Sequence, residues 1–147
     1  MDDIINLMRK KQNKDNDFNH VSMCLYKDID NKLTSTGINS SNKRYNNKKI
    51  TTHAEMSAIG NLRYKLSKHR IKKIKIDLFV VRFYKNNELC SSSPCHHCSI
   101  ELYKNKYIEI NNLYYSIEGG IVKIKFSEWM KNNDKVISKG WQYKLCN

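Results

Sequence analysis

Two short motifs set far apart in the chain place the strongest constraint on its fold: Thr52-His53-Ala54-Glu55 and Pro94-Cys95-His96-His97-Cys98. Histidine nitrogens and cysteine thiolates are preferred zinc ligands. His53, Cys95 and Cys98 are therefore the candidate ligands, and the fold has to bring them together around one ion. Three protein ligands leave a fourth position for water, as in catalytic zinc sites, and Glu55 is the candidate acid/base beside that water.

Each motif alone has a simpler interpretation. His53 and Glu55 also suit a capped helix with a buried histidine, and the two cysteines also suit a redox pair. A structural zinc site is a further alternative, with the fourth ligand taken from Cys90, His96 or His97 and no role for Glu55. The conjunction of the two motifs favours the catalytic site.

The order of elements predicts an α/β protein. Helical spacing or strand composition marks helices at 3–11, from 52 to about 66, at 94–105 and at 127–136, and strands at 20–27, 32–36, 74–83, 110–117 and 121–126. Residues 40–49 and 84–93 are predicted as loops. Helices interleaved with strands favour a three-layer α/β/α fold, with a five-stranded mixed sheet whose last two strands are antiparallel.

Both motifs are expected at helix starts. Thr52 is a good N-cap, with Glu55 completing a capping box, and Pro94 suits the first position of a helix. A helix start lowers a thiol pKa, and the spacing of Cys95 and Cys98 puts both sulfurs on one side of the first turn.

The two motifs resemble those of the cytidine/deoxycytidylate deaminase superfamily, over roughly residues 20–126. The resemblance implies a single deaminase-like domain over 1–147, with a C-terminal helix and tail at 127–147, and Zn²⁺ as cofactor. It implies hydrolytic conversion of cytosine to uracil by zinc-activated hydroxide, with Glu55 as the proton shuttle. It also implies a homo-oligomer as an alternative to a monomer.

The same resemblance suggests substrate contacts. Gly37-Ile38-Asn39 is similar to a G-x-N segment whose asparagine binds the substrate, and the backbone of Ala54 and Ser93 is expected to hold the base. Leu113-Tyr114-Tyr115 is similar to a strand of polynucleotide deaminases. Because strand residues alternate between faces, at most one of Tyr114 and Tyr115 is expected to wall the pocket. Ordinary turn and sheet roles remain alternatives for these residues.

Two departures from the family bear on the substrate. The stretch between the motifs is long, so residues 84–93 are expected to form an extra rim on the site. Glu118-Gly119-Gly120 is too short to hold the helix found there in the tRNA and polynucleotide branches. The expected substrate is therefore a free nucleoside or nucleotide, such as cytidine, deoxycytidine or a monophosphate.

Charge keeps a second substrate class open. The chain carries 27 basic and 14 acidic residues, a net charge of +13, which suits an enzyme that edits RNA or single-stranded DNA. The excess is mostly lysine spread along the whole chain, which equally suits a compositional bias. A non-catalytic, zinc-stabilised binding module is the third alternative.

The cysteine pattern bears on location. Five cysteines, two of them in C-x-x-C, suit reduced thiols and metal binding in the cytoplasm. No stretch approaches the roughly 20 apolar residues of a membrane helix, and the start of the chain does not resemble a secretory signal, so no membrane partner is expected.

Overall fold

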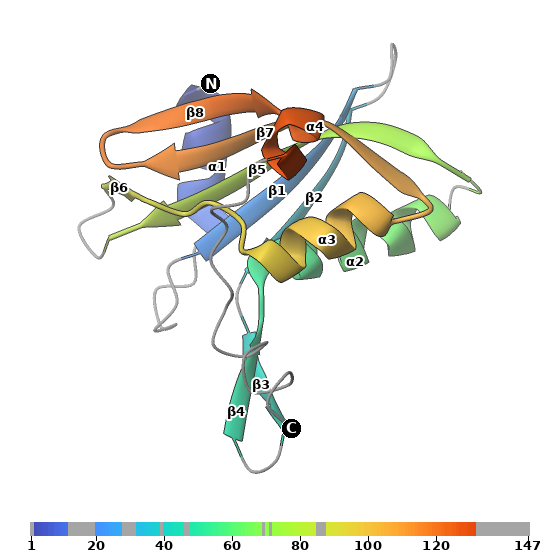
Figure 1. Ribbon diagram of the computed structural model, residues 1–147, viewed down its shortest axis with the longest axis horizontal. Coiled ribbons are helices and arrows are strands. Elements are labelled where there is room, and N and C mark those ends of the chain that lie inside the picture. Colours follow the sequence, from blue (N-terminus) through green and yellow to red (C-terminus); the bar gives the residue numbers. More distant parts are fainter. Residues whose placement is uncertain are drawn as a thin grey trace.

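The computed structural model describes residues 2–11, 20–27, 32–38, 40–45, 48–68, 70, 72–84 and 88–131. The elements are α1 (Asp2–Lys11), β1 (His20–Lys27), β2 (Lys32–Ile38), β3 (Ser40–Tyr45), β4 (Lys48–Thr52), α2 (Ala54–Lys68), β5 (Ile74–Phe83), β6 (Leu89–Cys90), α3 (His96–Lys104), β7 (Ile108–Ile117), β8 (Gly120–Lys125) and α4 (Phe126–Lys131). A central sheet has α1 on one side and α2 and α3 on the other (Figure 1), which is the predicted three-layer fold. None of the described helices is long and apolar enough to cross a membrane.

The main sheet has the strand order β2-β1-β5-β7-β8, and β6 pairs with the end of β5 at Arg82 and Phe83. The five predicted strands are present, and β6 adds a sixth inside the stretch predicted as a loop. β5 and β7 run parallel, and the remaining pairs are antiparallel. The antiparallel pairing of β7 and β8 confirms that prediction. Gly119 allows their tight turn, because its φ of 74° is accessible to glycine without steric cost.

Strand β5 is central because its sequence, IKIDLFVVRF, is buried at all but two positions. Its parallel pairing with β7 requires a crossover connection, which contains α3. This crossover carries the second motif to the same face of the sheet as α2. The path of the chain between β5 and β7 therefore places Cys95 and Cys98 near the start of α2.

A β-bulge sets the faces of β7. The β5–β7 register shifts between Ile76 and Leu78, where Asp77 Oδ1 accepts hydrogen bonds from the backbone N–H and the side-chain Nδ2 of Asn112, both 3.1 Å long. The extra residue changes the alternation along β7. Tyr115 consequently packs with the core under α2 and α3, and Tyr114 packs with the core under α1.

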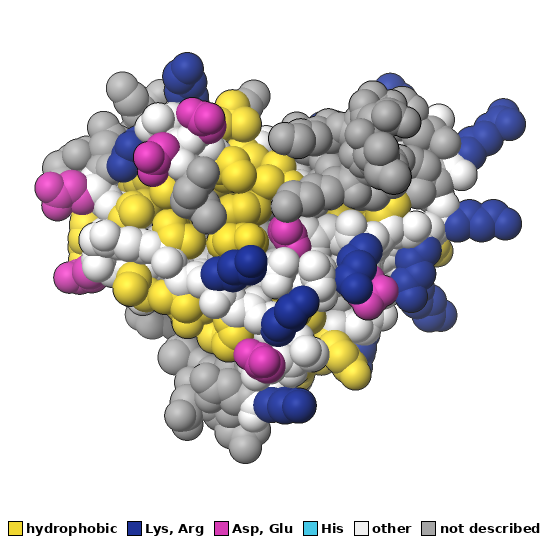
Figure 2. All heavy atoms as spheres, turned by 90° about the horizontal axis from the view of Figure 1, so that it is seen from above, with side chains coloured by type: hydrophobic (Ala, Val, Ile, Leu, Met, Phe, Trp, Pro, Cys, Tyr) yellow, Lys and Arg dark blue, Asp and Glu magenta, His cyan; other side chains and the backbone are white. Residues whose placement is uncertain are grey.

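The two faces of the sheet bury separate apolar clusters. The cluster under α2, α3 and α4 includes Leu62, Leu78, Leu102, Leu113 and Trp129. The cluster under α1 includes Ile5, Met8, Met23, Phe79 and Phe83. Edge strand β8 is only half-buried, and Figure 2 shows hydrophobic side chains gathered on the side of the molecule where β8 lies.

The prediction of a loop at 40–49 is wrong. Strands β3 and β4 pair antiparallel and form a hairpin that stands out from the body of the protein (Figure 1). Ser40–Tyr45 is almost entirely polar, so the alternation of apolar and polar residues that marks a half-buried strand is missing. The hairpin ends at Thr52, directly before the first motif.

Other boundaries shift by a few residues. The sequence predicts the second strand only to residue 36, but Gly37 and Ile38 extend it, because they pair with Ser22 and Val21 as part of β2. The last described helix is Phe126–Lys131, and the rest of the predicted 127–136 helix lies outside the described residues, as does the tail.

Candidate active site

His53 lies between β4 and α2. Thr52 pairs with Ser40 in the hairpin, so the predicted capping role of Thr52 is wrong. His53 is the N-cap of α2 instead, because its carbonyl accepts the first helical hydrogen bond, from the Ser57 N–H at 3.0 Å. The local structure therefore holds His53 at the junction of a strand and a helix start, with its side chain half-buried.

Close contact with β2 fixes the start of α2. A Cβ atom on Gly37 would lie 2.2 Å from the Ala58 backbone nitrogen and 2.7 Å from the Ala54 carbonyl oxygen, so only glycine fits at this position. Ser35 adds a hydrogen bond from its hydroxyl to the Ala58 carbonyl, 2.9 Å long. The first turn of α2, which carries Glu55, is thus held against the sheet.

The second motif begins α3. Cys95 is the N-cap, with extended backbone, and the Cys98 N–H donates to its sulfur at 3.4 Å. Pro94 therefore lies one residue before the cap, and its predicted place at the first helical position is wrong. Ser99 donates its hydroxyl to the Cys95 carbonyl at 2.9 Å and accepts from the Trp129 indole N–H at 2.9 Å. This hydrogen-bond chain ties the cysteine pair to α4.

The fold brings the three predicted ligands together. His53 Nδ1 lies 3.0 Å from Cys98 Sγ and 3.7 Å from Cys95 Sγ, and the three ligand atoms all lie within 4.8 Å of one another. Tetrahedral zinc with sulfur ligands at about 2.3 Å and nitrogen at about 2.0 Å places ligand atoms roughly 3.5–3.8 Å apart. The donor set is that of a zinc site, and the observed separations of 3.0 Å to at most 4.8 Å lie close enough to these values for small side-chain shifts to let the three atoms hold one ion.

The candidate zinc-ligand group has three members within the described residues. Cys90, His96 and His97 are described and do not join it, which argues against the structural site with a fourth protein ligand. The described part of the chain thus supplies a set that leaves one tetrahedral position open, as in catalytic zinc sites.

The two thiols titrate as a pair. Hydrogen bonding from Cys98 is the main cause that lowers the pKa of Cys95 to about 3, although burial opposes it. The same hydrogen bond, together with burial, raises the pKa of Cys98. The hydrogen bond to Cys95 is also the main cause that raises the pKa of His53. Both thiols would have to be deprotonated to hold a dication, because thiols that coordinate a metal are thiolates.

Glu55 is buried, with 6% of its surface exposed. Burial is the main cause that raises its pKa, and the charge of His53 opposes the shift. The Glu55 charge also raises the pKa of Cys24, His53 and Cys98, so the carboxyl belongs to the electrostatic surroundings of the ligand group. A buried carboxyl with a raised pKa is a stronger base than an exposed one, which suits a group that takes up a proton.

The residues predicted to bind the substrate differ in burial and in the face of the sheet they occupy. Ala54 is fully buried at the start of α2, and Ser93 is exposed two residues before Cys95. Asn39 lies outside the described residues. Tyr115 is on the face of the sheet shared with α2 and α3, whereas Tyr114 is on the opposite face, stacked on Phe79 with ring centroids 4.2 Å apart.

Sequence reasoning did not identify the residues that position the second motif. Ser92 is buried, donates its hydroxyl to the Val80 carbonyl at 2.8 Å, and shares a 2.8 Å hydrogen bond with the Ser116 hydroxyl. Its backbone N–H also donates to the Ser116 carbonyl at 3.0 Å. Ser92 sits in a run of three serines, where no sequence signal separates the buried member from its neighbours.

Comparison with known families agrees with this geometry. The family described as the cytidine and deoxycytidylate deaminase zinc-binding region matches residues 1–115, which include all three ligands and Glu55. None of the curated protein sequences compared with the chain matches it. The match covers most of the chain, so this protein belongs to the cytidine and deoxycytidylate deaminase zinc-binding family.

Proposed function

We propose that this protein hydrolytically deaminates cytosine in a free nucleoside or nucleotide, giving uracil and ammonia. The observation that carries the proposal is the buried Glu55 beside three ligand atoms that leave one zinc position open. The reduced cysteines that this site needs favour a cytosol-like compartment.

The ligand group would hold zinc through His53 Nδ1, Cys95 Sγ and Cys98 Sγ. When bound, zinc supplies Lewis-acid chemistry that lowers the pKa of water to about 7. Glu55 then has two tasks. Its carboxylate takes a proton from the attacking water, and its carboxylic acid returns protons to the ring nitrogen and to the departing amine. Burial raises the pKa of Glu55, so its carboxylate is a stronger base and takes the proton more readily than an exposed glutamate would.

Substrate positioning rests on the residues around this centre. We assign the base contacts to the Ala54 N–H and the Ser93 carbonyl, and the sugar contact to Asn39. Tyr115 is the tyrosine on the appropriate face for packing near the base, since Tyr114 is covered by Phe79. These assignments derive from the family resemblance and from the faces that the elements occupy.

The topology of the last strands supports a small substrate. β7 and β8 are antiparallel and joined through Glu118 and Gly119, without an intervening helix. Family resemblance links this arrangement to the branch that acts on free cytidine. The helix-containing segment that the polynucleotide branches use to contact flanking bases is thus missing between β7 and β8, so a strand of RNA or DNA would have fewer contacts here.

A second candidate function is editing of RNA or single-stranded DNA. It is favoured by exposed tyrosines that lie beside cations: Arg63 is 4.8 Å from the Tyr107 ring centroid, and Lys68 is 5.1 Å from that of Tyr64. Aromatic side chains next to positive charge are typical of surfaces that bind single strands.

One experiment separates these functions. Zinc-loaded protein is incubated with cytidine, deoxycytidine, their monophosphates, and a cytosine-containing oligonucleotide, and ammonia and uracil are measured. We expect turnover of at least one small substrate and loss of turnover in Glu55→Gln, which retains zinc. Turnover of the oligonucleotide alone would support the second function and contradict the first.

The same panel tests the third alternative, a zinc-stabilised binding module. If zinc-loaded protein turns over none of these substrates, the proposed reaction is wrong. If Glu55→Gln keeps its zinc and loses an activity that the parent has, the module alternative is wrong.

A further inference from the structure

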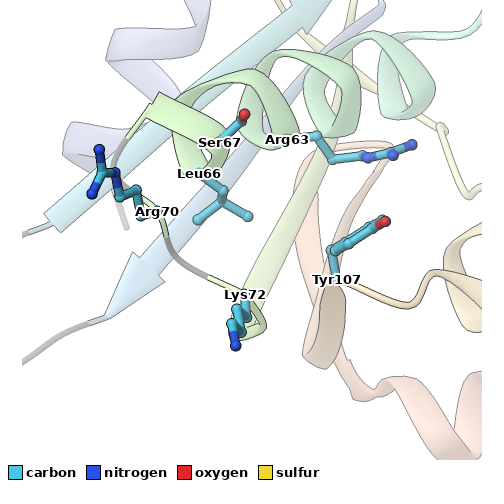
Figure 3. Close-up of a pocket in the computed structure, with 6 residues that line it drawn as sticks. All are labelled: Arg63, Leu66, Ser67, Arg70, Lys72 and Tyr107. Atoms are coloured by element: carbon cyan, nitrogen blue, oxygen red, sulfur yellow. The ribbon is translucent and has the colours of Figure 1, made fainter.

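A second concave site lies at the far end of α2. It is a pocket of about 600 Å³ lined by Arg63, Leu66, Ser67, Arg70, Lys72 and Tyr107 (Figure 3). A helix rises about 1.5 Å per residue, so Arg63 and Ser67 lie roughly 14–20 Å along the axis from Ala54. The pocket is therefore separate from the zinc site, and its size is in the range of small-ligand sites.

The lining residues give this pocket a positive potential. Arg63, Arg70 and Lys72 contribute three cations, and none of the six lining residues is acidic. No ion pair joins these cations to a carboxylate within the described residues. Two of the chain's five arginines lie here, so a general excess of lysine does not account for the arrangement. Mutual repulsion among the cations is relieved by a bound anion.

One guanidinium is held in place before any ligand arrives. Arg63 stacks over the ring of Tyr107 at 4.8 Å, and Figure 3 shows its side chain extending from α2 toward that tyrosine. Stacking leaves the edge of the guanidinium able to donate hydrogen bonds, and it lowers the entropy cost of using them. A guanidinium edge can donate two parallel hydrogen bonds to an oxyanion.

The second guanidinium is carried on an unusual backbone. Arg70 has φ of 55°, in the left-handed region, and its N–H donates to the Ser67 carbonyl at 3.2 Å. This is a helix-terminating conformation that glycine or asparagine normally adopts. The arginine side chain is therefore kept at the pocket at some cost to folding stability.

We propose that this pocket binds a phosphate group, through Arg63, Arg70 and Lys72, at a site distinct from the zinc centre. Arginine forks match phosphate oxygens, the Ser67 hydroxyl can add a hydrogen bond, and the buried side chain of Leu66 offers an apolar floor. The phosphate belongs either to a free phosphorylated small molecule or to the backbone of a single strand. Both present the same chemistry to the pocket, and binding measurements distinguish them.

The first test measures binding of two probes to the full chain at several salt concentrations. The probes are inorganic tripolyphosphate and a fluorescent ten-residue oligothymidylate. The pocket variant Arg63→Gln/Arg70→Gln/Lys72→Gln is compared with Lys10→Gln/Lys125→Gln/Lys131→Gln, which removes the same charge from exposed positions outside the pocket. Circular dichroism and zinc content check that both variants fold.

The two triple variants are expected to differ. The pocket variant should bind at least one probe about tenfold more weakly than the control, and three lost contacts to a single strand would reduce the slope of log K against log salt by about 2. Pocket-dependent binding of the oligonucleotide identifies a strand backbone as the source. Pocket-dependent binding of tripolyphosphate alone identifies a free phosphate. Equal weakening in both variants, or no binding of either probe, overturns the proposal.

A single variant separates binding from folding. Arg70→Gly removes one cation and relieves the left-handed strain, so it should raise the melting temperature while weakening probe binding several-fold. Ser67→Glu, which places a carboxylate at the exposed rim, should weaken binding without unfolding the protein. Unchanged binding in both variants would contradict a phosphate site here.

Discussion

His53 Nδ1 lies 3.0 Å from Cys98 Sγ, although 45 positions separate the two residues in the chain. The contact depends on two independent supports. The β3–β4 hairpin and the start of α2 hold the histidine, and the crossover from β5 to β7 delivers the cysteine.

Replacing a ligand should remove zinc and stability together. Cys98→Ser is expected to lose zinc and to unfold at a lower temperature, because a ligand present at 100 times its dissociation constant contributes about 2.7 kcal/mol. Metal analysis and thermal unfolding provide the measurements. Cys90→Ser is the matched control, since Cys90 is a buried cysteine outside the ligand group. Equal zinc loss in both variants would mean that Cys90 is a fourth zinc ligand and that the site is structural.

The contact between β2 and α2 should tolerate no side chain at residue 37. Gly37→Ala places a methyl group 2.2 Å from the Ala58 backbone nitrogen, and the needed backbone shift should cost about 1–3 kcal/mol or more. Urea unfolding gives the free energy.

The control for this variant is Gly60→Ala on the exposed side of α2. A Cβ there meets nothing within 4 Å, and alanine should stabilise the helix by about 0.5–1 kcal/mol. The two glycine variants should therefore change stability in opposite directions. A stabilised Gly37→Ala would refute the close approach of β2 to α2.

The β-bulge in β7 should depend on Asp77. Asp77→Ala leaves two donors of Asn112 without their acceptor in a buried position, at a cost of about 1–3 kcal/mol. Glu109→Ala is the control, because its 4.0 Å pair with Lys75 joins two exposed side chains and should contribute less than about 0.5 kcal/mol. Chemical unfolding of both variants measures the difference, and equal losses would argue against a structural role of Asp77.

The buried Glu55 should make stability depend on pH. Its folded pKa is raised by burial, so in metal-free protein the folded state holds this proton more tightly than the unfolded state does. The contribution is fully present below the unfolded pKa, and it is lost as pH rises through the folded pKa. Glu55→Gln removes the titration.

Unfolding of the parent protein and of Glu55→Gln, both stripped of metal with a chelator, should therefore be compared from below to well above the ordinary glutamate pKa. We expect the variant to gain stability relative to the parent as pH rises above the ordinary glutamate pKa of 4.5. A difference that is constant with pH would mean that Glu55 titrates like an exposed glutamate.

Local chemistry made the zinc site predictable from sequence. Histidine and cysteine at the spacing of His53, Cys95 and Cys98 have few roles other than metal binding. The turn at Glu118 and Gly119 was likewise predictable, because it is too short to contain a helix. Apolar runs such as Ile74–Phe83 marked the central strand for a similar reason, since burial on both faces leaves a continuous signal.

Tertiary structure decided what depends on distant partners. The pairing of β3 with β4 has no periodic signal in the sequence, because hydrogen bonds between backbone groups, and not buried apolar side chains, form it. Ser92 and Ser93 are equivalent in sequence, and only the packing of the chain against Ser116 buries the first and exposes the second. Tyr114 and Tyr115 face opposite sides because strand residues alternate, but the bulge in β7 opposite Asp77 determines which of them faces the helices of the zinc site. Sequence thus determined the chemistry of the ligands, and long-range contacts determined which side chains surround them.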